Sequence, residues 1–514
     1  MTRTFDSIVV GGGTAGAIVA ARRAADPRHR VLLGEAGPHY PAAALPAELA
    51  NANAMALASH SWGMSARLTD DRLVRFPQAR VMGGGSAVGN TVAIRPLPED
   101  LDEWCQLGNP SWTWQNCLPL LCELEDDRDF AGPLHGQGGP VPIRRFARGE
   151  LAPLQAAFYD VCIEQGHPIA PDHNHPDSTG VGPMPTQRTP DDIRISSADG
   201  YLRSAPANLT ILSGGTVGKV LLDGAGNAHG VELVDDGGAR PVYAGRVVLC
   251  AGAVMTPAIL QRSGIGDPDD VAAAGAELRV ELAGVGRNLL DQPRVGVFLA
   301  PRDGAENLGV STGQIVLRTT SQTDGRRNDL YYAMVSRFEL TQHFPHLRND
   351  PRAGRGAVYG VMAVARQPRS RGRVRAVSPN PLTLPEIDLG YLSDPEDLAL
   401  LAECVAGCWE LAGSPAIAGR SDTGPLLLTA ADVTERGEAL HGYLRATVDS
   451  AYNPAGTARM APAELGGVVD EHGQVHGCGA LYVADASVFP SMVRANINLT
   501  VMLVAERIAR RLAA

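Results

Sequence analysis

The sequence predicts an α/β fold, and the first 35 residues carry that prediction. Residues 7–10, Ser-Ile-Val-Val, form a short β-branched run that is typical of a buried strand. Residues 17–25 follow as an Ala-rich stretch with helical composition, and residues 31–33, Val-Leu-Leu, begin a second strand. A strand, a helix and a second strand in this order predict a βαβ unit with parallel strands.

The turn between the first strand and the helix carries a glycine pattern with a chemical use. Gly11, Gly13 and Gly16 satisfy G-x-G-x-x-G. Gly11 permits a tight turn, Gly13 lets the backbone approach a pyrophosphate, and Gly16 lets the helix pack closely on the strand. The helix N-terminus favours phosphate, and Glu35, nineteen residues after Gly16, is placed to bind ribose hydroxyls. The pattern predicts a dinucleotide site, without choosing between FAD and NAD.

Further elements are expected along the chain. Residues 208–211 and 247–251 are typical of strands that flank a Gly/Asp-rich hairpin region. Thr256-Pro257 predicts a helix start, and Ser263-Gly264 predicts its end. Residues 505–514 predict a terminal amphipathic helix.

Composition bounds the class of protein. The 514 residues are 44% hydrophobic and 20% charged, which excludes disorder and collagen and, at about 100–200 residues per domain, suggests two or three domains. The net charge of −11 gives no electrostatic basis for binding nucleic acid or an anionic membrane. No apolar run reaches the length of about 18 residues that a membrane span needs, and no signal segment is recognised. We therefore expect a cytoplasmic protein without a membrane span.

Cysteine and histidine patterns give no metal site. The eight cysteines include no C-x-x-C pair, so zinc ribbons and dithiol redox motifs are unsupported and the thiols are expected to be reduced. His167, His173 and His175 lie in or beside the Pro- and Asp-rich stretch 170–195, without a clear set of Cys or carboxylate partners. This stretch is expected to be a mobile surface loop, and no metal is expected.

Several spaced motifs resemble one family. Residues 79–102, with Gly83-Gly84-Gly85, resemble the first signature of the glucose–methanol–choline (GMC) family of FAD oxidoreductases, and residues 252–266 match its second signature. Residues 284–291, 482–488 and 496–498 are similar to further family blocks, in the family's order. The resemblance runs from residue 6 to about residue 510 and implies FAD, a small-molecule substrate and a CH–OH donor. Residues 83–95 contain no histidine, so the FAD is expected to be noncovalent.

The resemblance also implies an architecture and a set of residues. A Rossmann-like FAD-binding domain is assembled from residues 1–155, 196–300 and 446–514, and a substrate domain with a six-stranded antiparallel sheet from 156–195 and 301–445. For Asp485, a bond to a ribityl hydroxyl and a helix cap are both open. The expected cofactor residues are Gly11, Gly13, Thr14, Ala15, Gly16, Glu35, Ala36, Trp62, Arg80, Gly83, Gly84, Ser86, Gly89, Asn90, Val217, Ala251, Asp485, Ala486, Asn496 and Asn498.

One position departs from the family pattern. The catalytic block, which resembles Tyr-His-Pro-x-Gly-Thr-x-x-Met in the family, begins here with Tyr452-Asn453-Pro454. The expected catalytic pair is therefore Asn453 and Asn496. A neutral imidazole accepts a hydroxyl proton at pH 7, whereas an amide only orients by hydrogen bonds. Asp449, His441, His472 and His476 are the nearby titratable residues that could replace the base.

The loss of this histidine leaves the chemistry open. An FAD-dependent oxidoreductase acting on a CH–OH donor is the leading interpretation, and a slow reaction, a displaced base and a substrate that needs no base are all open. A family lyase or light-driven enzyme and a noncatalytic FAD-binding protein are the alternatives. Because Asn453 brings no charge to stabilise a superoxide-like anion, a dehydrogenase is slightly favoured over an oxidase. A quinone, a carrier protein and O2 are all open as the electron acceptor.

Overall fold

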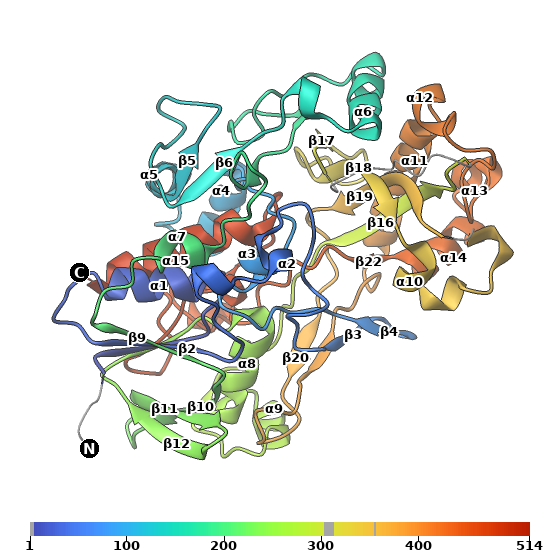
Figure 1. The fold of residues 1–514 in the computed structure, drawn as a ribbon. Helices are drawn as coiled ribbons and strands as arrows, with labels where there is room; N and C mark the ends of the chain where they lie inside the picture. The colour runs from blue at the N-terminus through green and yellow to red at the C-terminus, as the bar shows by residue number, and fades with distance from the viewer. Residues whose placement is uncertain (1–4, 303–312, 354–355, 514) are drawn as a thin grey trace.

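The fold is described from a computed structural model, in which residues 5–302, 313–353 and 356–513 are described. A parallel five-stranded sheet has the order β23 (Leu481–Val483), β13 (Val247–Leu249), β1 (Ser7–Val10), β2 (Val31–Glu35) and β9 (Leu209–Ser213). Its central strands are buried on both faces, as expected for a parallel sheet covered by helices. Figure 1 shows α1 (Thr14–Arg23) and α15 (Ile497–Ala513) lying against each other over this sheet.

The N-terminal prediction is confirmed in type and order. The strand expected at 7–10 is β1, the strand begun at 31–33 is β2, and β1 pairs with β2 in parallel. The strands expected at 208–211 and 247–251 are β9 and β13. One boundary was wrong: α8 (Gly252–Arg262) begins four residues before Thr256, so Pro257 lies inside the helix. The C-terminal helix α15 also begins earlier than residue 505.

The second large sheet has six strands that pair only in antiparallel fashion, as the resemblance implies. Arg294 pairs with Val364 in its centre, and Val364 pairs with Tyr331 on the next strand. β16 and β22 belong to this sheet although residues 293–299 and 449–450 fall in ranges assigned above to the FAD-binding domain, so the division into domains stays a prediction. The order is β22 (Asp449–Ser450), β16 (Pro293–Leu299), β19 (Val358–Ala365), β18 (Leu330–Phe338), β17 (Ile315–Thr319) and β7 (Gly180–Pro183).

The two faces of the six-stranded sheet have different neighbours. Successive side chains of a strand point to opposite faces. Val295 and Val297 point to the core that the sheet shares with α11 (Pro395–Ala412), α6 (Pro153–Glu164) and α14 (Glu438–Thr447). Arg294 points the other way and lines the cavity described below. In Figure 1 the helices α11 and α14 lie on the far side of this sheet from α1 and α15.

Smaller elements complete the fold. An antiparallel hairpin sheet, β10 (Thr216–Leu222), β11 (Ala228–Asp235) and β12 (Gly238–Tyr243), packs on α8. The other elements include β3 (Ser65–Thr69), β4 (Arg72–Arg75), β20 (Arg373–Arg375), β21 (Glu386–Asp388), β5 (Glu125–Asp127), β6 (Val141–Arg144), β8 (Thr186–Gln187), β14 (Ile265–Gly266), β15 (Val280–Glu281), α2 (Ala47–Ala50), α3 (Gly85–Val88), α4 (Pro98–Gln106), α5 (Trp114–Leu124), α7 (Ser197–Tyr201), α9 (Pro268–Ala273), α10 (Leu340–His343), α12 (Pro415–Ala418) and α13 (Ala430–Glu435). Within the described ranges, no helix has the length and apolarity that a membrane crossing requires.

The stretch 170–195 differs from its prediction as a mobile surface loop. Asp172, His173 and Asn174 are buried. Asp172 accepts from Arg145 (2.6 Å) and pairs with His135 (3.0 Å), whose other ring nitrogen lies 3.1 Å from a carboxylate oxygen of Asp127. A polar segment is buried here because its charges are paired, which composition alone does not reveal.

The same ionic network has ligand atoms spaced as in a metal site. Glu125, Asp127 and His135 come within 4.8 Å of one another, but the guanidinium groups of Arg95 and Arg145 pair with the two carboxylates. Burial opposes the charged form of His135, yet its hydrogen bonds to the surrounding carboxylates raise its pKa to about 11. The carboxylates of this network belong to Glu125, Asp127 and Asp172. They are matched by three cations, those of Arg95, Arg145 and His135.

Candidate active site

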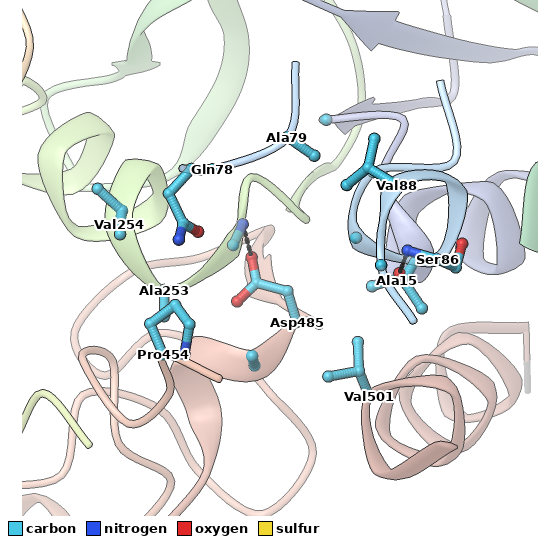
Figure 2. Close-up of a pocket in the computed structure, with 18 of the residues that line it drawn as sticks. Ala15, Gln78, Ala79, Ser86, Val88, Ala253, Val254, Pro454, Asp485 and Val501 are labelled. Carbon is cyan, nitrogen blue, oxygen red and sulfur yellow. Dashed lines mark hydrogen bonds between the residues drawn. The ribbon is translucent and has the colours of Figure 1, made fainter. Parts of the chain in front are cut away.

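A continuous cavity opens at the C-terminal ends of β1 and β2 and extends to the six-stranded sheet. Figure 2 shows Ala15 and Ser86 on one side of it, Ala253, Val254 and Pro454 on the other, and Asp485 between them. Of the residues predicted from the sequence, those that line the cavity are Gly11, Gly13, Thr14, Ala15, Glu35, Ala36, Trp62, Gly84, Ser86, Gly89, Asn90, Val217, Ala251, Asn453, Asp485, Ala486, Asn496 and Asn498.

Two glycine loops meet at the phosphate end of this cavity. Gly13 precedes α1 and offers no side-chain cap, so the first-turn N–H groups of the helix remain open to a ligand. Gly84 has φ of +52°, and a Cβ built there would lie 2.6 Å from the Cα of Gly13. Side chains at these positions would fill the space between the loops. The backbone thus forms a cradle that suits a pyrophosphate.

Three predicted residues support the cavity from behind its wall. A Cβ on Gly16 would lie 1.7 Å from the Gly11 carbonyl oxygen, so the helix reaches the strand only because this position is glycine. Gly83 packs against Ser196, where a Cβ would lie 2.9 Å from the hydroxyl oxygen. The guanidinium of Arg80 stacks over the Trp62 ring at 4.7 Å and so holds that cavity residue in place.

Glu35 is buried at the end of β2, where a ribose site is expected. Its carboxylate accepts from the backbone N–H groups of Gly12 and Gly37, each at 2.7 Å. Burial raises the pKa of Glu35, and these two hydrogen bonds oppose that rise. Each oxygen keeps acceptor capacity beyond these bonds, which a ribose hydroxyl can use.

Asp485 shows the helix-cap role that the sequence left open. Its carboxylate accepts from the N–H and hydroxyl of Ser487 at 2.8 and 2.6 Å, from the N–H of Gly252 at 2.8 Å and from the hydroxyl of Thr256 at 2.6 Å. It therefore ties the segment after β23 to the first turn of α8. A bond from Asp485 to a ribityl hydroxyl stays a prediction.

The two asparagines at the catalytic positions share one hydrogen-bond network. The amide nitrogen of Asn453 donates to Oε1 of Gln292 (2.8 Å), and the same oxygen accepts from Arg366 (2.8 Å). Arg366 also donates to Oδ1 of Asn496 (3.1 Å). Neither Gln292 nor Arg366 was singled out from the sequence. Asn498, two residues along the chain, donates to Gln187 at 2.9 Å.

The turn that presents Asn453 is strained and anchored. Tyr452 has φ of +59°, a left-handed conformation that is unusual for a bulky residue. The buried carboxylate of Asp291 accepts from the Asn453 N–H at 2.9 Å and from the hydroxyl of Ser450. Burial raises the pKa of Asp291 to about 6 despite these donors. The anchored turn directs Asn453 into the cavity.

A charged group on the sheet faces the same part of the cavity. Arg294 lines the cavity, lies 5.1 Å from the centre of the Tyr452 ring and pairs with Asp449, which also bonds His343 at 2.6 Å. Burial opposes ionisation of Asp449, but Arg294 and then His343 hold its pKa below the usual range. Asp449 is therefore committed to an ion pair. Asp449, His441, His472 and His476 are all absent from the described cavity lining.

Comparison with known proteins places this geometry in a family. The GMC oxidoreductase N-terminal model matches residues 5–294, and the C-terminal model matches residues 368–505. The chain belongs to the GMC oxidoreductase family. It is 34% identical to 5-(hydroxymethyl)furfural oxidase of Methylovorus sp. (strain MP688), over 99% of each chain. It is 32% identical to an oxygen-dependent choline dehydrogenase of Photobacterium profundum, over 99% of this chain and 93% of the other.

A solved structure agrees with this assignment over the whole chain. Pyridoxine 4-oxidase from Mesorbium loti superposes with a TM-score of 0.88 and 28% identity, covering 99% of both chains. The α/β fold with the six-stranded sheet is therefore that of GMC oxidoreductases.

FAD is the cofactor of this family, and the residues present fit it. The glycine cradle of Gly13 and Gly84 leaves room for a pyrophosphate, and the Glu35 carboxylate keeps acceptor capacity for a ribose hydroxyl. Asn453 and Asn496 line the same cavity, so both amides would face the space that holds the cofactor. Noncovalent attachment stays a prediction.

Proposed function

We propose that this GMC oxidoreductase oxidises a CH–OH donor, an alcohol or an aldehyde hydrate, at the end of the cavity marked by Asn453 and Asn496. The observation that carries the proposal is the convergence of these two amides in the cavity that begins at the glycine cradle. When bound, FAD supplies a two-electron acceptor for hydride. The named activities of the furfural oxidase, choline dehydrogenase and pyridoxine oxidase relatives support a primary alcohol or an aldehyde as donor.

The chain's own residues bind and orient the donor in this proposal. Asn453 and Asn496 hydrogen-bond the substrate hydroxyl, and the Tyr452 and Arg294 side chains form the wall beside it. An amide does not take up a proton at pH 7, so the hydroxyl proton leaves to water, and none of the described side chains that line the cavity at this point serves as its base. This favours hydrates and acidic hydroxyls over simple alcohols.

An anaerobic absorbance titration tests the proposal. Purified holoprotein is mixed with alcohols, aldehydes, hydroxy acids and amines, and bleaching of the flavin bands by a CH–OH donor is the expected result. Admission of air then separates an oxidase from a dehydrogenase. A dehydrogenase is proposed because Asn453 carries no charge, but the guanidinium of Arg366 one hydrogen bond from Asn496 weakens that argument.

A second candidate rests on the same asparagine. Without a base at position 453, a lyase or light-driven reaction on this fold is compatible with the site, as is a protein that holds FAD without turnover. Flavin that no member of the library bleaches, in a protein that retains full FAD content, would favour these alternatives and overturn the redox proposal.

A further inference from the structure

Arg366 is a buried cation without an ionic partner beside the two catalytic-position amides. Its side chain is 2% exposed, and no salt bridge joins it to a carboxylate in the part of the chain that the structure describes. Its Nη1 donates to Gln292, its Nη2 donates to Asn496, and the ring of Tyr331 lies 4.1 Å from the guanidinium carbon. Arg23 is also a buried arginine without a salt bridge to the described residues, so what sets Arg366 apart is its bond to Asn496, a residue that lines the cavity.

The sheet register explains why Arg366 and Gln292 meet. Arg294 on β16 pairs with Val364 on β19, so two residues further along this antiparallel ladder Gln292 lies opposite Arg366. A step of two residues keeps the same face, and Arg294 shows that this face looks toward the cavity. Gln292 in turn donates to the Arg366 carbonyl at 3.2 Å, which closes the pair.

The network determines how both asparagine amides are turned. Gln292 Nε2 is surrounded by three carbonyl oxygens, those of Arg366, Val493 and Ala495, at 2.9–3.2 Å, so its nitrogen must point to them. Its Oε1 is left to accept from Arg366 and from Asn453, which therefore presents its nitrogen to Gln292. Arginine has only donors, so Asn496 must turn its oxygen to Arg366.

With the amides turned in this way, the two asparagines present opposite hydrogen-bonding groups to the cavity. Asn453 keeps its Oδ1, an acceptor, and Asn496 keeps its Nδ2, a donor. A substrate hydroxyl that bridges them donates its proton to the first and accepts from the second. The Asn496 donor is polarised by the cation behind it, which favours negative charge on the substrate oxygen.

We propose that Arg366 is the positioning residue of this site. Its two terminal nitrogens bond Asn496 and Gln292, and so determine which atom Asn496 and, through Gln292, Asn453 turn toward the cavity. Its positive charge raises the electrostatic potential in the part of the cavity where the flavin ring is to lie. The charge takes the place of the one that a protonated histidine at position 453 would have carried. The effect expected on kcat rests on the proposed function, whereas the effect expected on the mid-point potential needs only bound FAD.

Three variants and a readout that needs no substrate test the proposal. Arg366→Met removes the charge and keeps apolar volume, and Arg366→Lys keeps the charge but not the fork. Arg23→Met is the control, because Arg23 is also a buried arginine but lies in the last turn of α1 and bonds the Leu512 carbonyl, away from the cavity. The mid-point potential of bound FAD is measured with a chemical reductant, and kcat and KM with the best donor.

The expected pattern separates charge from geometry. Arg366→Met lowers the mid-point potential, because the reduced cofactor carries more negative charge and loses a stabilising cation. Arg366→Lys keeps the mid-point potential near that of the wild type, because the charge remains. It lowers kcat about tenfold or more with little change in KM, because a single ammonium group does not fix the orientation of both amide side chains. Arg23→Met changes neither.

Two results would overturn the proposal. A wild-type potential in FAD-loaded Arg366→Met refutes the electrostatic role, and a wild-type kcat in Arg366→Lys refutes the positioning role. If Arg366→Met does not take up FAD, Arg366→Gln, which keeps a donor for Asn496, is measured instead with the same expected fall in potential. If no donor reduces the wild-type protein, the proposed function fails while the potentials still decide the role of the charge.

Discussion

The substitution Gly84→Ala tests whether the two glycine loops form the FAD cradle. Its Cβ would lie 2.6 Å from the Gly13 Cα, and φ of +52° with ψ of −134° lies outside the regions that L-residues adopt. Such a backbone conformation costs about 1–3 kcal/mol, and overpacking adds about 1–3 kcal/mol. The overlap is relieved when the two loops move apart. Because this movement opens the cradle, we expect the free-energy cost to appear as weaker FAD binding.

The total of about 2–6 kcal/mol predicts at least about a 30-fold rise in the FAD dissociation constant, at 1.4 kcal/mol per factor of ten. Apoprotein is titrated with FAD, and flavin fluorescence quenching is followed. The matched control is Gly442→Ala in the exposed middle of α14, where a Cβ meets nothing within 4 Å. That variant should gain about 0.5–1 kcal/mol of stability and keep its FAD affinity. An affinity of Gly84→Ala within threefold of the wild type would refute the cradle.

Three further predictions concern ionisation. Asn453→His should raise kcat about 100-fold above the imidazole pKa of about 6.5, seen as a new step in the pH profile of kcat; an unchanged profile would mean that the missing base does not limit the rate. His135→Asn should lower the free energy of unfolding by about 3 kcal/mol at pH 7. This deficit should shrink steadily as pH rises from about 6.5 to about 11, because a raised histidine pKa stabilises only while the folded state holds a proton that the unfolded state has lost; urea unfolding at pH 7 and 10.5 checks it. Asp291, with a pKa of about 6 against 3.8 for an ordinary Asp, makes the folded state bind more protons, so the free energy of unfolding should fall by up to about 3 kcal/mol as pH rises from 4 to 6.5. Asp291→Asn should flatten that slope, and an equal slope in both proteins would contradict the assignment.

The nucleotide end of the fold was predictable because its determinants are local. The strand at 7–10, the glycines that follow and Glu35 lie within about 30 residues, and each sets a turn, a close approach or an acceptor by itself. The helix start predicted at Thr256 was wrong because Pro257 lies inside the helix, where the Ala253 carbonyl that a proline leaves without an N–H donor accepts from the hydroxyl of Thr457 instead. The surface loop at 170–195 was wrong for Asp172–Asn174 because their partners, Arg145 and His135, are distant in sequence.

The substrate end depends on register, which no local pattern reports. Gln292 and Arg366 are neighbours only because β16 and β19 pair in one alignment, and a slip of either strand by one residue would turn its side chain to the helix-covered face. Arg366 also lies between the two ranges that match the family, 5–294 and 368–505, where resemblance gives least guidance. The sequence therefore revealed that Asn453 lacks a charge but not that a buried guanidinium reaches the same amide network. A guanidinium does not titrate near neutrality as a histidine does, so a site built on Arg366 keeps its positive charge in both redox states of the cofactor. Such a site cannot use this residue as a base, but it stabilises negative charge at every stage of the reaction.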